Sequence, residues 1–192
     1  MKTNAKMMAI GLVLVMVFCY AGTGLAETSI HGDTASVELN FQVTIANYIE
    51  FRVGTAGVTT NTINFSPTAA ELGASTPITG TGGDVVGSQV TVSLLSNTPQ
   101  ITITATNDTP TGLENGIDRI DWLSITTTDV TGNLAPPLLN NAGGEVSPDT
   151  PLAGPQTITT TWEYEYTRRV GDPIPSIPGT YNGTVTYTAT SL

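Results

Sequence analysis

Apolar and polar residues alternate with a period of two along most of this chain. Such alternation is typical of β-strands that bury one face. It occurs in eight stretches, namely residues 37–45, 49–53, 62–66, 88–96, 100–107, 119–126, 157–167 and 179–192. These stretches are rich in Thr, Val, Ile and aromatic residues, which favour a pleated, half-buried surface. The pattern therefore predicts about eight strands.

Turn-forming residues separate the predicted strands. Residues 96–100, "SNTPQ", predict a hairpin turn, and residues 80–84 and 109–118 predict loops. Residues 132–155 and 171–179 carry several prolines, which remove backbone donors and predict irregular connections.

Only "TAAELGA", residues 68–74, has the composition of a short helix. The expected fold is all-β: an antiparallel, immunoglobulin-like β-sandwich of about seven to nine strands, formed by residues 47–192.

The first 26 residues have the pattern of a secretory signal peptide. Lys2 and Lys6 precede an apolar run, and small residues precede Glu27. A membrane anchor is the alternative, but the run is short for a span, which needs roughly 20 apolar residues. We expect cleavage after Ala26, no membrane span afterwards, and a location in the bacterial periplasm or at the cell surface. Residues 27–46 would then form an N-terminal strand or extension.

Charge and cysteine content narrow the classes of partner. The chain has six Lys and Arg residues, of which Lys2 and Lys6 leave with the signal peptide, so four arginines face sixteen carboxylates. A net charge of about −12 repels nucleic acid, so no nucleic-acid partner is expected. The single cysteine, Cys19, also leaves, so no disulfide is expected to stabilise the mature domain.

The side chains that carry chemistry are few, and no catalytic, cofactor-binding or metal-binding residue is predicted. The mature chain has one histidine, His31, near its beginning, which disfavours a zinc site and a catalytic triad. A carboxylate-rich loop suggests calcium, but its spacing does not match a calcium-binding motif, so turn capping is the preferred interpretation. The residues of that loop are Asn107, Asp108, Glu114, Asn115, Asp118 and Asp121.

Glu163 and Glu165 alternate with aromatic residues on one predicted strand. A pair of carboxylates suggests a glycosidase. The preferred interpretation is that the aromatic residues face the core and the two acids face water, with Arg168 and Arg169 available to pair with them.

The two ends of the mature chain resemble those of chaperone–usher pilins. Gly179 is the fourteenth residue from the end, and Tyr181, Val185, Tyr187 and Ala189 follow it in alternation. A second alternating set lies close behind the signal peptide: Val37, Leu39, Phe41, Val43 and Ile45. In pilins of that class, such an N-terminal segment fills a groove in a neighbouring subunit beside the last strand. The chain departs from the family in having Ser191 next to last and no disulfide.

The resemblance implies a non-catalytic structural subunit of a bacterial surface filament, with itself or a periplasmic chaperone as partner. The alternative is a self-complete secreted sandwich that binds glycan or another cell-surface ligand. Exposed aromatic residues among Tyr48, Trp122, Trp162 and Tyr166 would stack on sugars. A secreted hydrolase is the third hypothesis. On the first hypothesis Val37 to Ile45 is the donated strand, and the strand that begins at Gly179 is the edge that receives it.

Overall fold

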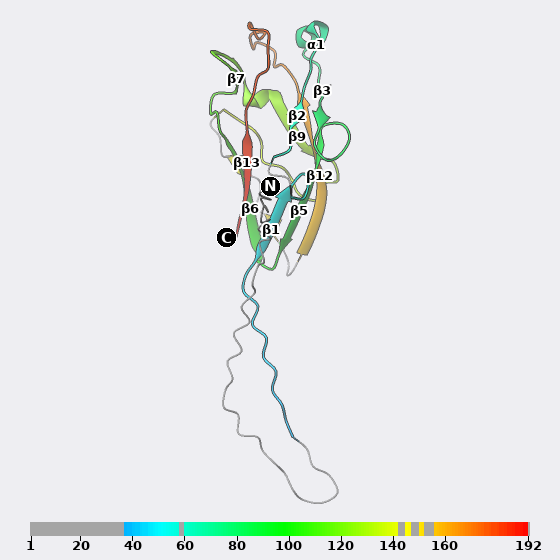
Figure 1. Cartoon of the computed structure of the whole chain (residues 1–192), viewed down its shortest axis with the longest axis vertical. Coiled ribbons are helices and arrows are strands. Elements are labelled where there is room, and N and C mark those ends of the chain that lie inside the picture. The colour runs from blue at the N-terminus through cyan, green and yellow to red at the C-terminus, as the bar shows by residue number, and fades with distance from the viewer. Residues whose placement is uncertain (1–36, 58–59, 142–144, 147–149, 152–155, 192) are drawn as a thin grey trace, which may run out of the picture. The chain divides into compact units, whose positions relative to one another are not determined.

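The computed structural model describes residues 37–57, 60–141, 145–146, 150–151 and 156–191. The chain divides into two units, Met1–Ala46 and Asn47–Leu192. The described part of the first unit, residues 37–46, contains no helix or strand. All the secondary structure described below belongs to the second unit (Figure 1).

Two antiparallel sheets make up most of the second unit. The first contains β1 (Ile49–Val53), β5 (Gln89–Ser96), β12 (Gln156–Tyr166) and β3 (Ile78–Thr79) in that order, and β9 (Ile125–Asp129) also pairs with β12. In the second, β6 (Gln100–Asn107) pairs with β10 (Glu145–Val146), β11 (Thr150–Pro151) and β13 (Val185–Ser191). The predicted all-β antiparallel sandwich is confirmed.

Short elements complete the unit. β2 (Ile63–Asn64) pairs with β4 (Thr81–Gly82), and β7 (Leu113–Asn115) pairs with β8 (Asp118–Ile120). The helix α1 (Ala69–Ala74) lies within the range that its sequence predicted. Thr68 begins it with a capping box, because its side chain accepts from the Glu71 N–H while the Glu71 carboxylate accepts from the Thr68 N–H.

The core lies between the two sheets and is built by the alternation of the long strands. β5 and β6 bury every second side chain, and β12 buries the aromatic residues Trp162, Tyr164 and Tyr166. The Trp162 ring meets the Tyr187 ring of the other sheet edge-on, with 5.2 Å between ring centroids. Edge-to-face pairs of this kind add stability beyond the burial of their area.

The structure corrects three predicted strands. Residues 119–126 are interrupted by a 3₁₀ helix, Trp122–Ser124, because the Asp121 carboxylate caps the Leu123 N–H. The last strand begins at Val185 rather than at Gly179. Residues 37–45 form no strand, and no described strand pairs with them.

The proline-rich connection 132–155 contains two strands of two residues each, β10 and β11, although no regular structure was predicted there. They form short ladders with β6 at its two ends. The predicted signal peptide, 1–26, lies outside the described residues, as does His31.

Candidate functional site

The last strand, β13, is one wall of the candidate site. One of its edges pairs with β6 over all seven residues from Val185 to Ser191, and no described strand pairs with the other edge. Val185, Tyr187 and Ala189 are half-buried and pack against the core, whereas the threonines between them are exposed. These three residues therefore have the predicted alternating burial.

The first strand, β1, is the opposite wall. It pairs with β5 through five residues, and among the described strands none pairs with its other edge. Its apolar residues Ile49, Phe51 and Val53 are only half-buried, unlike those of β5. β1 and β13 lie close together but form no ladder with each other. Phe51 and Val53 of β1 and Val185 and Tyr187 of β13 line one space between the two edges.

That space is a groove of about 1150 Å³. The segment 60–67 extends the β1 wall, and the segment 177–184 extends the β13 wall. Its floor is apolar and aromatic, made of side chains from both sheets and from the connections: Val90, Leu113, Ile120, Trp122, Ile125, Leu139, Tyr164 and Tyr166. A groove lined in this way suits apolar side chains presented by an extended chain.

Two tyrosine hydroxyls meet at the bottom of the groove. The Tyr164 hydroxyl of β12 donates to the Tyr187 hydroxyl of β13 across 3.1 Å. Burial raises the pKa of Tyr164 to about 12 and raises the pKa of Tyr187 well above its usual value. Both hydroxyls are therefore neutral at physiological pH, and the bond joins the two sheets.

The far end of the β13 wall is held by one carboxylate, that of Asp118 on β8. Its Oδ2 accepts from the Tyr181 hydroxyl at 2.6 Å, from the Ser176 N–H at 2.7 Å and from the Ile177 N–H at 2.9 Å. The Tyr181 hydroxyl bond, followed by the Ile177 backbone bond, lowers the pKa of Asp118 far below its usual value. Tyr181 thus serves to anchor the wall, and Asp118 was not predicted for this role.

The predicted glycine, Gly179, occupies a backbone conformation with φ of +150°, which disfavours any other residue. A Cβ on it would lie 2.6 Å from Nδ2 of Asn115. Gly183 is required for a different reason, since a Cβ there would lie 2.5 Å from the ring of Trp122. The wall therefore needs glycine at both positions to pack against the β7–β8 hairpin and the floor.

The five predicted donor residues lie in the other unit and are exposed. Their exposed fractions are 66% for Val37, 74% for Leu39, 87% for Phe41, 84% for Val43 and 72% for Ile45. The polar residues between them are exposed as well. The segment thus carries five apolar side chains that nothing in the described chain buries.

The carboxylate-rich loop does not form a metal site in the described residues. There, no group of three or more His, Cys, Asp or Glu side chains is placed to hold a metal ion. Asp108 accepts from the Thr184 N–H, Asp121 caps the 3₁₀ helix, and Glu114 pairs with Arg119 at 3.3 Å. Each of these acids stabilises a turn or a connection.

The aromatic and acidic residues of β12 take the preferred arrangement. Glu163 and Glu165 are half-buried on the face opposite Tyr164. Of the four aromatic residues named for the alternative glycan-binding hypothesis, Trp122, Trp162 and Tyr166 are buried and Tyr48 is 41% exposed. Three of the four are therefore not available to stack on a sugar.

Arg168 was available to pair with these acids but donates instead to backbone carbonyls, those of Leu72 and Asp172. Its guanidinium ties α1 to the connection before β13.

Sequence reasoning missed part of the groove. The wall segment 60–67 shows only weak alternation, and the prolines of 171–179 predicted a connection without indicating that it lines a groove.

In the part of the chain that the structure describes, no helix has the length and apolar character needed to cross a membrane. Comparisons with protein-family models, curated proteins and solved structures find no match to this chain.

Proposed function

We propose that this chain is a non-catalytic subunit of a surface filament, assembled by insertion of residues 37–45 of one copy into the groove of another. The proposal is supported by two features that would complement each other. Two strands that line one groove, β1 and β13, each have an edge without a partner among the described strands, and the chain carries an exposed alternating segment.

The groove is long enough for the segment. Its β13 wall runs from Ile177 to Tyr187, eleven residues, and the segment from Val37 to Ile45 has nine. In extended form the segment spans about 30 Å at 3.3 Å per residue. The donor's five apolar side chains lie on one face and its four polar ones on the other, so the groove takes the first set while the second faces solvent. Each large apolar side chain transferred from water contributes roughly 1.5–3 kcal/mol.

Backbone pairing adds to the burial. The free edge of β13 presents unpaired N–H and C=O groups, which an added strand satisfies. A subunit with such an edge is prone to aggregate, so a chaperone that covers the groove before assembly fits the same surface. The predicted signal peptide and the scarcity of charged residues support a secreted location.

The first test is the size of the purified mature chain. Sedimentation velocity should show polymers or aggregates that grow with concentration. A synthetic peptide of residues 35–46, added in excess during refolding, should occupy the groove and yield soluble single subunits. A peptide of the same composition with its alternation scrambled is the control. A heat-stable monomer that binds neither peptide would contradict the proposal.

A further inference from the structure

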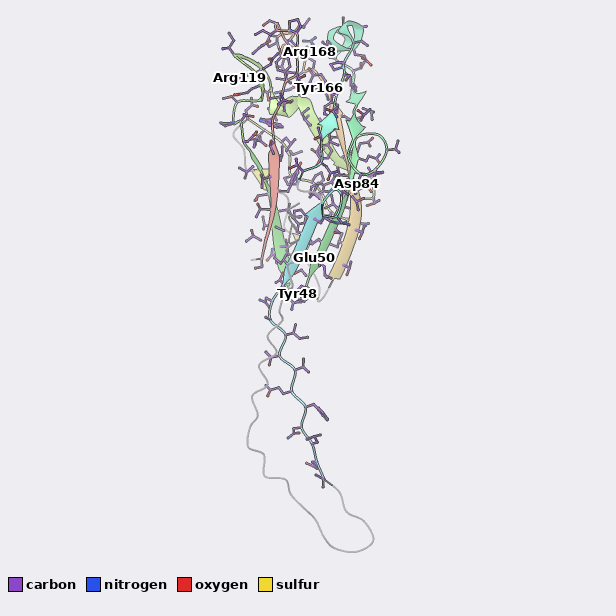
Figure 2. All side chains as sticks on the ribbon, in the orientation of Figure 1. Tyr48, Glu50, Asp84, Arg119, Tyr166 and Arg168 are labelled. Carbon is purple, nitrogen blue, oxygen red and sulfur yellow. The ribbon has the colours of Figure 1, made fainter. Side chains whose placement is uncertain are left out.

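Four exposed apolar side chains gather at one end of the second unit. Ile117 is 92% exposed, Val170 93%, Ile174 57% and Ile177 37%. They come from two loops that Asp118 joins, because its carboxylate accepts from the Ser176 and Ile177 N–H groups. We call these four residues the pole patch. Figure 2 shows Arg119 and Arg168, which neighbour the patch in sequence, at this end, and Tyr48 and Glu50 at the opposite end.

We propose that the pole patch receives the Tyr48 end of the next copy in the filament. This inference rests on the proposed strand insertion and adds a second contact surface to it. Only Ala46, Asn47 and Tyr48 separate the donor segment from β1. Three extended residues span about 10 Å, so the donor copy's sandwich must lie directly against whichever end of the groove its segment leaves.

The groove reaches the pole patch. Its lining includes Pro175 and Ile177 at that end, but on the β13 wall it stops at Tyr187 and on the β1 wall it stops at Phe51. A donor that left by the opposite end would have to pass Thr188–Ser191, which is about 13 Å of strand. The three-residue link before β1 spans only about 10 Å, so it is too short. Leaving by the pole avoids that obstruction and makes the donor antiparallel to β13.

The two ends present different groups to such a contact. At the pole, Arg169 is exposed next to Val170, while Arg119 is paired with Glu114 at 3.3 Å and Arg168 donates to the backbone carbonyls of Leu72 and Asp172. At the other end, Glu50 is exposed one residue after Ile49 begins β1. Tyr48, whose N–H donates to Oδ1 of Asn97 at 2.8 Å, keeps its position against the β5–β6 turn. An apolar patch thus meets an end that presents an aromatic ring.

Cysteine cross-linking tests the contact, since the only cysteine of the chain is Cys19 in the predicted signal peptide. The double variant Asn47→Cys with Ile177→Cys should form a ladder of covalent multimers on mild oxidation. The matched variant Asn47→Cys with Ser191→Cys should remain uncross-linked. Cross-linking of the second variant instead of the first would overturn the pole contact while leaving strand insertion in place. Failure of both to assemble, seen by sedimentation before oxidation, would instead contradict the proposed function.

A matched pair of valines tests the patch without cysteine. Val170 and Val86 are 93% and 92% exposed, and only Val170 belongs to the pole patch. Val170→Asp should raise the concentration needed for assembly by about tenfold or more, whereas Val86→Asp should leave it unchanged. Equal effects of the two substitutions would overturn the proposal. Near-UV circular dichroism of both variants, compared with the unchanged chain, checks that the fold is retained.

Discussion

The segment from Val37 to Ile45 and the strands β5 and β6 have the same alternation and opposite burial. In β5 and β6, the alternate apolar side chains are between 0% and 3% exposed, while the five of the N-terminal segment are between 66% and 87% exposed. The difference is in the neighbours, since β5 has a partner strand on each side and the segment has none in the described chain. A period of two therefore predicts that a face will be buried, but it does not say whether the burying surface belongs to the same molecule.

The largest expected effect is loss of assembly on placing a charge in the donor segment. Phe41→Asp puts a carboxylate into an apolar groove, where desolvation without a partner opposes insertion. We expect assembly to be abolished in sedimentation velocity, with the secondary structure of the subunit unchanged. Gln42→Asp, one residue away on the solvent face, should assemble normally. A Phe41→Asp chain that assembles fully but melts several degrees lower would mean that the segment is buried within its own copy.

The next effect compares one substitution in the two regions. Ile103 of β6 is fully buried and Ile45 is 72% exposed. In a Phe41→Asp background, which keeps subunits separate, Ile103→Ala should lower the free energy of unfolding by about 2–5 kcal/mol. Ile45→Ala in the same background should change it by less than about 0.5 kcal/mol.

In the unaltered background, Ile45→Ala should weaken assembly, because the side chain enters the groove of the next copy. Urea denaturation measures the first pair of effects and concentration-dependent sedimentation the second. A large loss of stability for Ile45→Ala in the separated subunit would remove the distinction between the two regions.

Sequence alone predicted the long core strands, because their own residues alternate between apolar and polar. β5, β6 and β12 were predicted because every second residue is apolar, and the turn between β5 and β6 because of its Asn, Pro and Ser residues. The prediction that Trp122 lies in a strand was wrong, because the Asp121 carboxylate caps a 3₁₀ helix there. In the sequence, Asp121 cannot be distinguished from any other acid that precedes an apolar residue. The wall formed by Asp118 and Tyr181 was missed because it joins residues 63 positions apart.

Alkaline pH tests the hydrogen bond between the Tyr164 hydroxyl of β12 and the Tyr187 hydroxyl of β13. The pKa of Tyr164 is raised to about 12, so the folded state keeps its proton where the unfolded chain, with a value near 10, loses it. The stability that this contributes is fully present below pH 10 and is lost as the pH rises to 12. A pKa that differs by about 2 between the folded and unfolded states corresponds to about 2–3 kcal/mol of unfolding free energy.

Tyr164→Phe should lower the unfolding free energy by about 1 kcal/mol at pH 7 and make its fall above pH 10 shallower. Urea denaturation at pH 7 to 11.5, in the separated subunit, measures both. An equally steep fall in the variant would assign the alkaline loss to other groups, with Tyr187 the first to test.

The smallest effect is local and concerns the end of the groove wall. Asp118→Asn keeps the shape of the side chain but removes the negative charge that strengthens its bonds to Tyr181, Ser176 and Ile177. The rest of the sandwich does not depend on these bonds, so the melting temperature should change little. The amides of Ser176 and Ile177 should exchange with solvent faster, by about tenfold, in nuclear magnetic resonance measurements.

In the unaltered chain the lowered pKa of Asp118 means that this protection is present at neutral pH and is lost only at pH values well below the usual range of an aspartate. Asp84→Asn is the control, because Asp84 accepts from the Thr91 N–H in a different part of the unit. If the amides of Ser176 and Ile177 exchanged no faster in Asp118→Asn than in the control variant, the segment 175–181 would be held by its prolines rather than by the carboxylate. The groove end would then keep its shape for an incoming strand without any charged contact.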